Sequence, residues 1–595
     1  MQDNTLSNNL NRIKDATDGI RETLSMPNAS IEELAEAVIV PPSGAINITS
    51  NGLYDVMAYE NANINVEPEE KTVFFYDYDG VLLYEYTKTD FLTLTEMPAF
   101  KTKIGMVAEE WNWTLTDAQD YVRFNGGLII GQICRTNDDS LRIYCSLTEP
   151  CLLPYLNLQV AGTINVNWGD GTQEEFTLGS ASQWGFNYEW LVQQHIYPQE
   201  GDYIITITGK DGNIADNGVT ICGEPTNNTK YYGVLLADKR YDEMTSGEGH
   251  GYIGVITKIE IGRIVKDLGS KAVARFNNLH SINLIKELGW NTPSNWYTLN
   301  RCDLECIIIP SNWDRTPYYF AGWNVHLRII SLPKQLTTIE CEAFRYSAVE
   351  TFYLPPAANN MSFHILADCP NLEKVVIPEG ITILPTNFLT NDSNLKHIIV
   401  PSTLTAINYG ALDSTGIEEL DLSLTRVTML GTNALNGCRQ LKKIIFPIYN
   451  TLTTLNRGAI NYCNSLEELI IPDSVTSIQS GFNSLEKVKK LQFPVNVKID
   501  NVSFGDFLNL TTLVIPMTNN TSYGYSFWRN LSLINYDFSN FTYVPGEGIN
   551  YMSDINPNYR FIVPDNLYET WITTGNWGNY SDHIVKASEW DGGNN

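Results

Sequence analysis

Hydrophobic positions recur at a fixed interval through the second half of the chain. Segments of the form L-x-x-I-x-I-P repeat, and the prolines that close them lie 23, 22, 23, 23, 46, 25, 22 and 22 residues apart. Ile417–Leu422 fills the double interval, with Leu424 where proline would stand. Six residues after the proline comes another apolar residue, such as Ile339 or Ile478. This period of about 23 residues predicts a solenoid of stacked turns with short strands.

The full repeat reads L-x-x-I-x-I-P-x-x-V-T-x-I-x-x-x-A-F-x-x-C, and the segment LEELIIPDSVTSIQSGF at 466–482 follows it closely. It resembles the BspA-like leucine-rich repeat, which implies a solenoid over residues 226–545. The segment NYRFIVPDNLYETWITTGNWGNYSDHI resembles the cap that closes such arrays, so 546–595 is assigned as a C-terminal cap.

Two register positions of the repeat hold polar or charged residues in successive turns. Small or polar residues share one register position, which predicts a buried structural column rather than reactive thiols: Ser347, Cys369, Asp392, Thr415, Cys438 and Cys463. A Cys438–Cys463 disulfide stays open as an alternative. In the second column, charged pairs at successive strands change sign from Glu418-Glu419 through Lys489-Lys490. This charge ladder is interpreted first as a device that fixes strand register.

The N-terminal segment, residues 1–40, is expected to be a helical anchor. Its apolar positions follow spacings of 4, 3, 4, 3 and 4, the pattern of a coiled-coil seam. The seam residues are Leu6, Leu10, Ile13, Thr17, Ile20 and Leu24. Two interpretations stay open: a helix that packs on its own domain, and a segment that associates with copies of itself or with a larger assembly.

The sequence of residues 41–145 predicts small β-rich modules. Within KTVFFYDYDGVLLYEY, Asp77, Asp79 and Gly80 imitate the DxDG motif of haloacid-dehalogenase-like phosphotransferases. That chemistry needs a doubly wound sheet, whereas aromatic residues alternate on both sides of Asp79-Gly80 as in a two-stranded hairpin. The hairpin is therefore the prediction, followed by a short helix near Asp117–Val122.

A third pattern occupies residues 146–225. Trp168-Gly169-Asp170-Gly171 is followed by His195-Ile196-Tyr197 and by an alternating strand from Tyr203. These motifs resemble the PKD-type immunoglobulin-like β-sandwich, a family of spacers and binding modules, so the resemblance implies no catalysis. The fold class expected for the whole chain is thus multidomain and mainly β, with N-terminal helices, β-hairpin modules, a PKD-like sandwich and a leucine-rich-repeat solenoid.

Composition narrows the function. The 595 residues carry 39 basic and 68 acidic side chains, a net charge of −29, which disfavours nucleic acid as a partner. No apolar run reaches the roughly 18–20 residues of a membrane span, and the N-terminus lacks the features of a secretory signal. No motif of catalysis, metal binding or cofactor binding appears in a supporting context. The protein is therefore expected to be a non-enzyme without cofactors.

An aromatic cluster near the start of the repeats is the candidate binding site. It is Trp290, Trp296, Tyr297, Trp313, Tyr318, Tyr319 and Trp323, with Phe320 among them. One interpretation has these rings filling irregular first turns. The other has them binding a host-cell glycan by stacking or anchoring a protein partner.

The N-terminal half is similar to modules of tail and appendage proteins of phages of gut Firmicutes. That resemblance implies a virion structural protein of a tail, baseplate or fibre, assembled in the host cytoplasm. Other virion proteins would bind its N-terminus, it would form a homo-oligomer, and its repeats would attach to the host cell. A capsid head fibre or decoration protein and a bacterial cell-surface adhesin stay as alternatives.

Overall fold

The computed structural model describes residues 69–590 with gaps. The described ranges are 69–152, 155–178, 189–210, 218–221, 236–237, 254–269, 272–288, 296–480, 482–494, 497–499, 503–515, 525–546 and 548–590. The chain divides into a unit of residues Met1–Glu70 and a second unit, Lys71–Asn595. The predicted seam from Leu6 to Leu24 lies outside the described residues and stays a prediction. Among the described residues, every helix is too short or too polar to cross a bilayer.

Residues 71–136 form a small α/β module. Its sheet has the order β2-β1-β4-β3. The strands are β1 (Lys71–Tyr76), β2 (Leu82–Thr87), β3 (Met106–Trp111) and β4 (Leu128–Thr136), and the helices are α3 (Lys88–Leu92) and α4 (Leu115–Asn125). Helix α4 begins at Thr114, whose side chain accepts from the Asp117 N–H, and ends at Gly126 with φ of 86°. The short helix predicted near Asp117–Val122 is confirmed.

The predicted hairpin at Asp79-Gly80 is also confirmed. Strands β1 and β2 pair in antiparallel fashion around it. The Asp77 carboxylate accepts from the backbone N–H groups of Asp79 and Val81 at 3.0 and 2.9 Å, and Gly80 adopts φ of 78°. The first aspartate of the DxDG sequence therefore closes a turn.

A ten-stranded sheet follows, built around the long strand β7 (Tyr155–Asn167). It pairs antiparallel with four described strands, β8 (Gln173–Leu178), β9 (Glu189–Gln193), β11 (Gly201–Gly209) and β12 (Gly218–Ile221), and with the short β13 (Leu236–Ala237). Strands β5 (Leu141–Leu147), β14 (Ile256–Glu260), β15 (Val265–Leu268) and β16 (Ser281–Ile282) extend it. The pair β6 (Cys151–Leu152) and β10 (Ile196–Tyr197) lies outside this sheet. The sheet thus draws strands from both sides of residues 146–225.

The Trp168 motif forms the internal support of this sheet. The Trp168 ring is fully buried and stacks on His195 at 4.6 Å between ring centroids. His195 contacts Asp170 at 2.7 Å, and the buried Tyr197 hydroxyl donates to the Trp168 carbonyl at 2.7 Å. Hydrogen bonds from Thr172 and His195 outweigh desolvation and lower the pKa of Asp170 to about 2. These residues join the turn that follows β7 to strand β10, which is a structural role.

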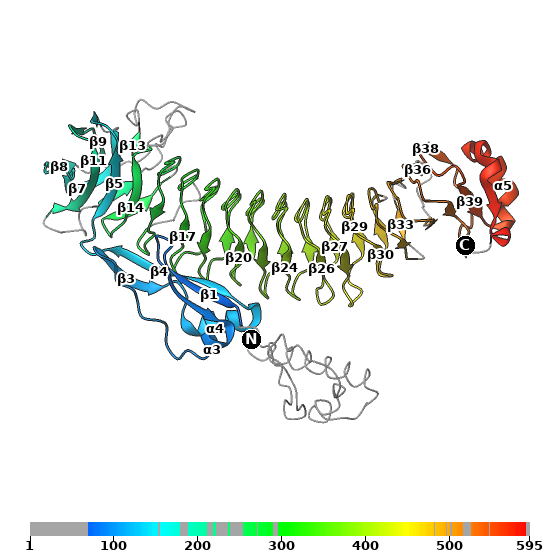
Figure 1. The fold of residues 1–595 in the computed structure, drawn as a ribbon, viewed down its shortest axis with the longest axis horizontal. Coiled ribbons are helices and arrows are strands. Elements are labelled where there is room, and N and C mark those ends of the chain that lie inside the picture. Colours follow the sequence, from blue (N-terminus) through cyan, green and yellow to red (C-terminus); the bar gives the residue numbers. More distant parts are fainter. Residues whose placement is uncertain are drawn as a thin grey trace, which may run out of the picture. The chain divides into compact units, whose positions relative to one another are not determined.

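The repeats form a solenoid of stacked turns (Figure 1), and backbone hydrogen bonds and strand pairs join successive turns on three sides. The first side consists of parallel strands that precede the repeat prolines. They are β17 (Cys306–Ile308), β18 (Ile329–Ser331), β20 (Thr351–Tyr353), β22 (Lys374–Val376), β24 (His397–Ile399), β26 (Glu419–Asp421), β28 (Lys443–Ile445), β30 (Glu468–Ile470), β32 (Lys490–Gln492), β35 (Thr512–Val514), β37 (Asn535–Asp537), β39 (Arg560–Val563) and β40 (Ile584–Lys586).

The second side is made of shorter parallel strands that follow the prolines. They are β19 (Thr338–Ile339), β21 (Asn360–Met361), β23 (Ile383–Leu384), β25 (Ala406–Ile407), β27 (Met429–Leu430), β29 (Thr454–Leu455), β31 (Ser477–Ile478) and β33 (Lys498–Ile499). Six of them, from β23 to β33, form one continuous sheet. The predicted apolar positions Ile339 and Ile478 face the core and are buried.

The third side carries two left-handed residues in each turn, four positions apart. In one turn the backbone N–H groups of Glu342, Phe344 and Tyr346 donate to the carbonyls of Phe363, Ile365 and Ala367 at 3.2, 3.0 and 3.2 Å. Glu342 and Tyr346 have φ of 52° and 60°. The N–H groups of every second residue in this segment therefore point toward the next turn. In the last turns, strands β34 (Ser503–Gly505), β36 (Tyr525–Trp528) and β38 (Ile549–Ser553) replace this pattern.

The predicted polar column is buried in the solenoid core. Cys369, Cys438 and Cys463 are fully buried and carry free thiols, so Cys438 and Cys463 form no disulfide. Burial raises the pKa of Cys438 to about 12, which keeps this thiol protonated. The thiol of Cys438 lies 3.1 Å from the Leu412 carbonyl of the preceding turn. The structural interpretation of this column is confirmed.

The last turns end in a helical segment. It contains α5 (Tyr568–Thr573) and the 3₁₀ helices η4 (Asp565–Leu567), η5 (Gly575–His583) and η6 (Ala587–Glu589). Trp571 and Trp577 are fully buried and contact Phe538 at 5.5 and 5.3 Å between centroids. These two indoles cover the apolar end of the stack.

The α/β module packs on the first side of the first turns. Asn112 donates to Ser331 Oγ at 2.9 Å, the Trp113 indole N–H donates to the Leu332 carbonyl at 2.8 Å, and the Tyr121 hydroxyl donates to the Leu354 carbonyl at 2.8 Å. A Cβ on Gly131 would lie 2.1 Å from an Ile308 methyl, so the backbone of β4 approaches the solenoid closely. Strands β17 and β18 are buried throughout, whereas β24 and later strands expose side chains.

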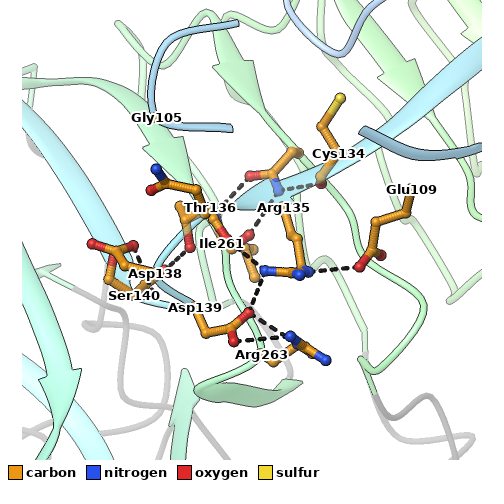
Figure 2. Close-up of polar contacts among 12 residues, drawn as sticks. Gly105, Glu109, Cys134, Arg135, Thr136, Asp138, Asp139, Ser140, Ile261 and Arg263 are labelled. Atoms are coloured by element: carbon orange, nitrogen blue, oxygen red, sulfur yellow. Dashed lines mark hydrogen bonds and ion pairs between the residues drawn. The ribbon is translucent and has the colours of Figure 1, made fainter. Parts of the chain in front are cut away.

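A second polar junction joins the module to the ten-stranded sheet, as Figure 2 shows. Arg135, at the end of β4, donates to Glu109 at 2.6 Å and to Asp139 at 2.7 Å. Arg263 donates to both oxygens of the same Asp139 carboxylate at 2.9 and 3.0 Å. One carboxylate thus holds two guanidinium groups that come from segments more than a hundred residues apart.

Candidate aromatic binding site

The left-handed positions of the first turns carry aromatic rings. Tyr297, Tyr319, Trp323 and Tyr346 have φ of 62°, 55°, 60° and 60°. Bulky side chains in this conformation cost on the order of 1–2 kcal/mol per residue relative to glycine. Later turns place less bulky residues here, such as Asn387, Gly410, Asn433, Gly437 and Gly458. The first turns therefore maintain aromatic rings at a conformational cost.

These rings form two stacks, together called the aromatic patch: Trp296, Tyr297, Tyr318 and Tyr319 in one stack, and Arg301, Trp323, Arg345 and Tyr346 in the other. Tyr297 and Tyr319 lie parallel, 4.4 Å between centroids. Trp296 lies 5.4 Å from Tyr318. In the second stack, Trp323 lies 5.2 Å from Tyr346.

Two guanidinium groups stack with Trp323. Arg301 lies 5.3 Å and Arg345 lies 5.7 Å from the centroid of its ring. Arg345 also lies 4.9 Å over the Tyr346 ring. Cation–π contacts of this kind stabilise the rings in place.

Two carboxylates hold Arg345, one from its own turn and one from the next turn. Arg345 donates to Asp368 at 2.6 Å and contacts Glu342 at 3.2 Å. Although desolvation opposes the charged form, these carboxylates raise the pKa of Arg345 above its usual value. The guanidinium is thus fixed in place and charged.

Three phenols of the patch, those of Tyr297, Tyr318 and Tyr319, remain protonated, because their pKa values are raised. Burial is the main cause that raises the pKa of Tyr297 and of Tyr319, and the neighbouring Glu340 carboxylate is the main cause for Tyr318. The patch therefore offers hydroxyl and guanidinium donors together with ring edges. Because Trp323 has charged planar groups against it, its faces are less available for stacking on a sugar than its edge is for packing against a protein.

The structure separates the predicted aromatic cluster into surface and core. Trp296, Tyr297, Tyr318, Tyr319 and Trp323 lie together on the patch, with Trp296 45% exposed. Trp313 is only 3% exposed and packs on the buried Phe320. The inclusion of Trp313 among the binding residues is corrected, because its ring faces the core. Trp290 lies outside the described residues.

Sequence reasoning missed Arg301, Arg345 and Tyr346. The repeat period supplied a signal for two of them, since Arg301 and Tyr346 stand one turn before and one turn after Trp323. Arg345 has no such signal, because its position beside Trp323 depends on the left-handed turn. Among the described residues, no group of three His, Cys, Asp or Glu side chains is arranged to hold a metal ion.

The parallel strands, the stacked turns and the buried leucine core define a β-solenoid protein of the leucine-rich-repeat class. Residues 316–427 and 421–535 match the BspA type leucine rich repeat region, in six copies. The chain therefore carries a BspA-type repeat region, as its sequence pattern indicates. The match does not reach residues 146–225, for which the PKD-type resemblance stays a prediction.

Solved structures with leucine-rich repeats are similar to part of the chain. A leucine-rich repeat protein from Bacteroides ovatus is 17% identical, with coverage of 53% of this chain and 96% of that one and a TM-score of 0.32. The pneumococcal vaccine antigen PcpA is 16% identical, with coverage of 55% and 76% and a TM-score of 0.34. A leucine rich cell surface protein from Faecalibacterium prausnitzii is 18% identical, with coverage of 48% and 77% and a TM-score of 0.26. No curated protein matches the chain.

Proposed function

We propose that the chain is a non-catalytic recognition protein whose solenoid binds a protein on the surface of a host cell through the aromatic patch. One observation carries this proposal: four aromatic residues occupy left-handed positions in consecutive early turns, whereas later described turns mostly place glycine, asparagine, aspartate or serine there, with His364, Tyr462 and Arg529 as exceptions. Unusual backbone conformations persist where the side chain they present is needed. Trp, Tyr and Arg are also the residues that dominate the energy of protein interfaces.

The virion is the proposed setting of this recognition protein, with the chain as a component of a phage tail, baseplate or fibre. The N-terminal modules support this setting through their resemblance to phage appendage proteins. Residues 1–40 would join the chain to other virion proteins. Mass spectrometry of purified particles tests the setting, since the chain should be present in them; its absence would contradict the virion assignment and leave the binding proposal to its own test.

Substitutions in the patch should weaken cell binding. We expect the variant Trp323→Ala/Tyr346→Ala to lose at least about tenfold in binding of the labelled full-length chain to host cells, because hot-spot truncations cost 2 kcal/mol or more. Flow cytometry over a panel of gut Firmicutes strains measures the binding. Protease treatment of the cells should remove it, whereas periodate oxidation of surface glycans should not.

The chain offers a matched control for this experiment. Tyr462 is also left-handed, with φ of 58°, and is 47% exposed, but it lies several turns beyond the patch. Tyr462→Ala should bind cells as the unmodified chain does. An equal loss in Tyr462→Ala, or retained binding in Trp323→Ala/Tyr346→Ala, would contradict the proposal.

A further inference from the structure

The first side of the solenoid carries four rows of alternating charge beyond the turns that the α/β module contacts. Each row is the outward-facing set of one strand. Row 1 is Glu418, Glu419 and Asp421; row 2 is Lys442, Lys443 and Ile445; row 3 is Glu467, Glu468 and Ile470; row 4 is Lys489, Lys490 and Gln492. The charged side chains that form ion pairs are 47–69% exposed, so they remain accessible.

The charge ladder is split into two blocks. Rows 1 and 2 are joined by ion pairs at 2.6 and 3.1 Å, and rows 3 and 4 by ion pairs at 3.6 and 2.9 Å. Strands β26 and β28 pair, as do β30 and β32. Among the described residues, no ion pair and no strand pairing joins row 2 to row 3. The predicted continuous ladder is therefore corrected to two separate blocks.

An alternating series with an even number of rows is complementary to its own reverse. If a second copy faces this side with its stacking direction reversed, row 1 meets row 4 and row 2 meets row 3. A two-fold axis parallel to the strands produces this arrangement and keeps each column opposite itself. Glutamate pairs then meet lysine pairs at every position, whereas an axis along the stack would place like charges together.

The third residue of each row also meets a matching partner when the rows are reversed. Reversal places Asp421 opposite Gln492, a polar pair, and Ile445 opposite Ile470, an apolar pair. The flanking rows continue it, because Ile399 comes to lie opposite Val514, and these two side chains are 43% and 38% exposed. Rows 1 to 4 are thus complementary in charge, and the third residues of all six rows are complementary in polarity.

We infer that this face is an isologous interface with a second copy of the chain, arranged antiparallel about an axis between rows 2 and 3. Six rows at about 4.8 Å extend roughly 24 Å along the stack, and each row is about 10 Å wide. The area of this face is therefore well below the about 800 Å² per partner of a standard interface. The dimer is therefore weak and sensitive to salt, because its charged contacts are exposed at the rim. This inference is independent of the aromatic patch.

Two variants with equal net charge separate contacts within the chain from contacts between copies. Glu418→Lys/Glu419→Lys/Lys489→Glu/Lys490→Glu breaks the ion pairs inside both blocks and keeps the reversed series complementary. Glu418→Lys/Glu419→Lys/Lys442→Glu/Lys443→Glu keeps the ion pairs of both blocks and sets like charges against each other between copies. The first variant should dimerise, and the second should lose at least about tenfold in affinity.

Sedimentation equilibrium of the full-length chain at about 50 mM and about 500 mM salt measures this affinity. Dimerisation of the unmodified chain should weaken at the higher salt. Equal behaviour of the two variants, or the reverse order of their affinities, would overturn the inference.

Cysteine crosslinking identifies this interface even where residues 1–70 also associate. Ile399→Cys and Val514→Cys lie several turns apart in one chain but face each other across the proposed axis. An oxidised mixture of the two single variants should give a crosslinked pair, while each variant alone should not. Crosslinking within either single variant but not in the mixture, or none at all, contradicts the proposed axis.

Discussion

Replacement of Trp313 by alanine is expected to destabilise the first turns of the solenoid by about 3–5 kcal/mol, the usual cost of removing a buried aromatic ring. The ring is 3% exposed and packs against Phe320, which in turn contacts Phe344 of the next turn. Removal of Trp313 leaves a cavity between turns that can relax only in part, because their backbones are fixed by hydrogen bonds on three sides.

Amide hydrogen exchange is the suitable measurement for Trp313→Ala, because a repeat array can open locally without complete unfolding. Exchange should accelerate in the turns around residues 299–344. Trp323→Ala is the matched control, since it removes the same kind of ring from the surface patch of the same turn. It should leave exchange of the buried amides nearly unchanged, and the opposite order of effects would show that the two indoles have exchanged roles.

The solenoid could be predicted from the sequence because its core demands a strict period. Leu372, Leu395 and Leu466 each lie two residues before a strand and are fully buried. A residue at such a position meets the same surroundings in every turn, so the constraint repeats. The hairpin at Asp79-Gly80 was predictable for a different reason, since glycine with positive φ is what a tight turn needs.

Which rings of the aromatic cluster are exposed and which are buried could not be predicted in the same way. Trp313 and Trp323 are ten residues apart in a region rich in aromatic residues, and nothing in local composition distinguishes them. Their difference arises from the left-handed conformation at Trp323, which turns the ring outward beside Arg301 and Arg345. Left-handed residues placed four positions apart follow no hydrophobic period of their own.

The packing of the α/β module on the solenoid also left no pattern in the sequence. Asn112 and Ser331 are 219 positions apart and are joined by hydrogen bonds from the Asn112 amide to the carbonyl and the hydroxyl of Ser331. Such contacts depend on how two folded surfaces match.

The break in the charge ladder coincides with the longest single interval of the repeat, the 25 residues from Pro447 to Pro472. One irregular interval can thus interrupt a pattern that the sequence suggests is continuous.

Asp392 is the polar group whose burial in the solenoid has the clearest consequence for pH dependence. Its Oδ1 accepts from the Cys369 N–H at 2.7 Å, while Oδ2 is buried without a hydrogen-bond partner. Burial raises the pKa of Asp392 well above its usual value. The folded state therefore favours the protonated acid, and its contribution to stability is complete below the unfolded pKa of about 3.9 and decreases as the pH rises toward the folded pKa.

Asp392→Asn should therefore stabilise the protein at neutral pH, by about 1–3 kcal/mol, the cost of leaving a buried polar group unpaired. The same register position holds Asn530, whose Oδ1 accepts from the Phe507 N–H at 3.2 Å and whose amide donates to the Phe504 carbonyl at 3.1 Å. An asparagine at 392 has the equivalent carbonyl of Leu366 available to it.

Thermal unfolding followed from about pH 4 to pH 8 should show a raised midpoint for Asp392→Asn and a weaker decline of the midpoint with pH above the unfolded pKa. Asp368→Asn supplies the contrast, because the Asp368 carboxylate is paired with Arg345 and its loss should not stabilise the fold. A lowered midpoint in Asp392→Asn at neutral pH would mean that the carboxylate is satisfied as an ion, and the buried neutral acid inferred for this turn would be wrong.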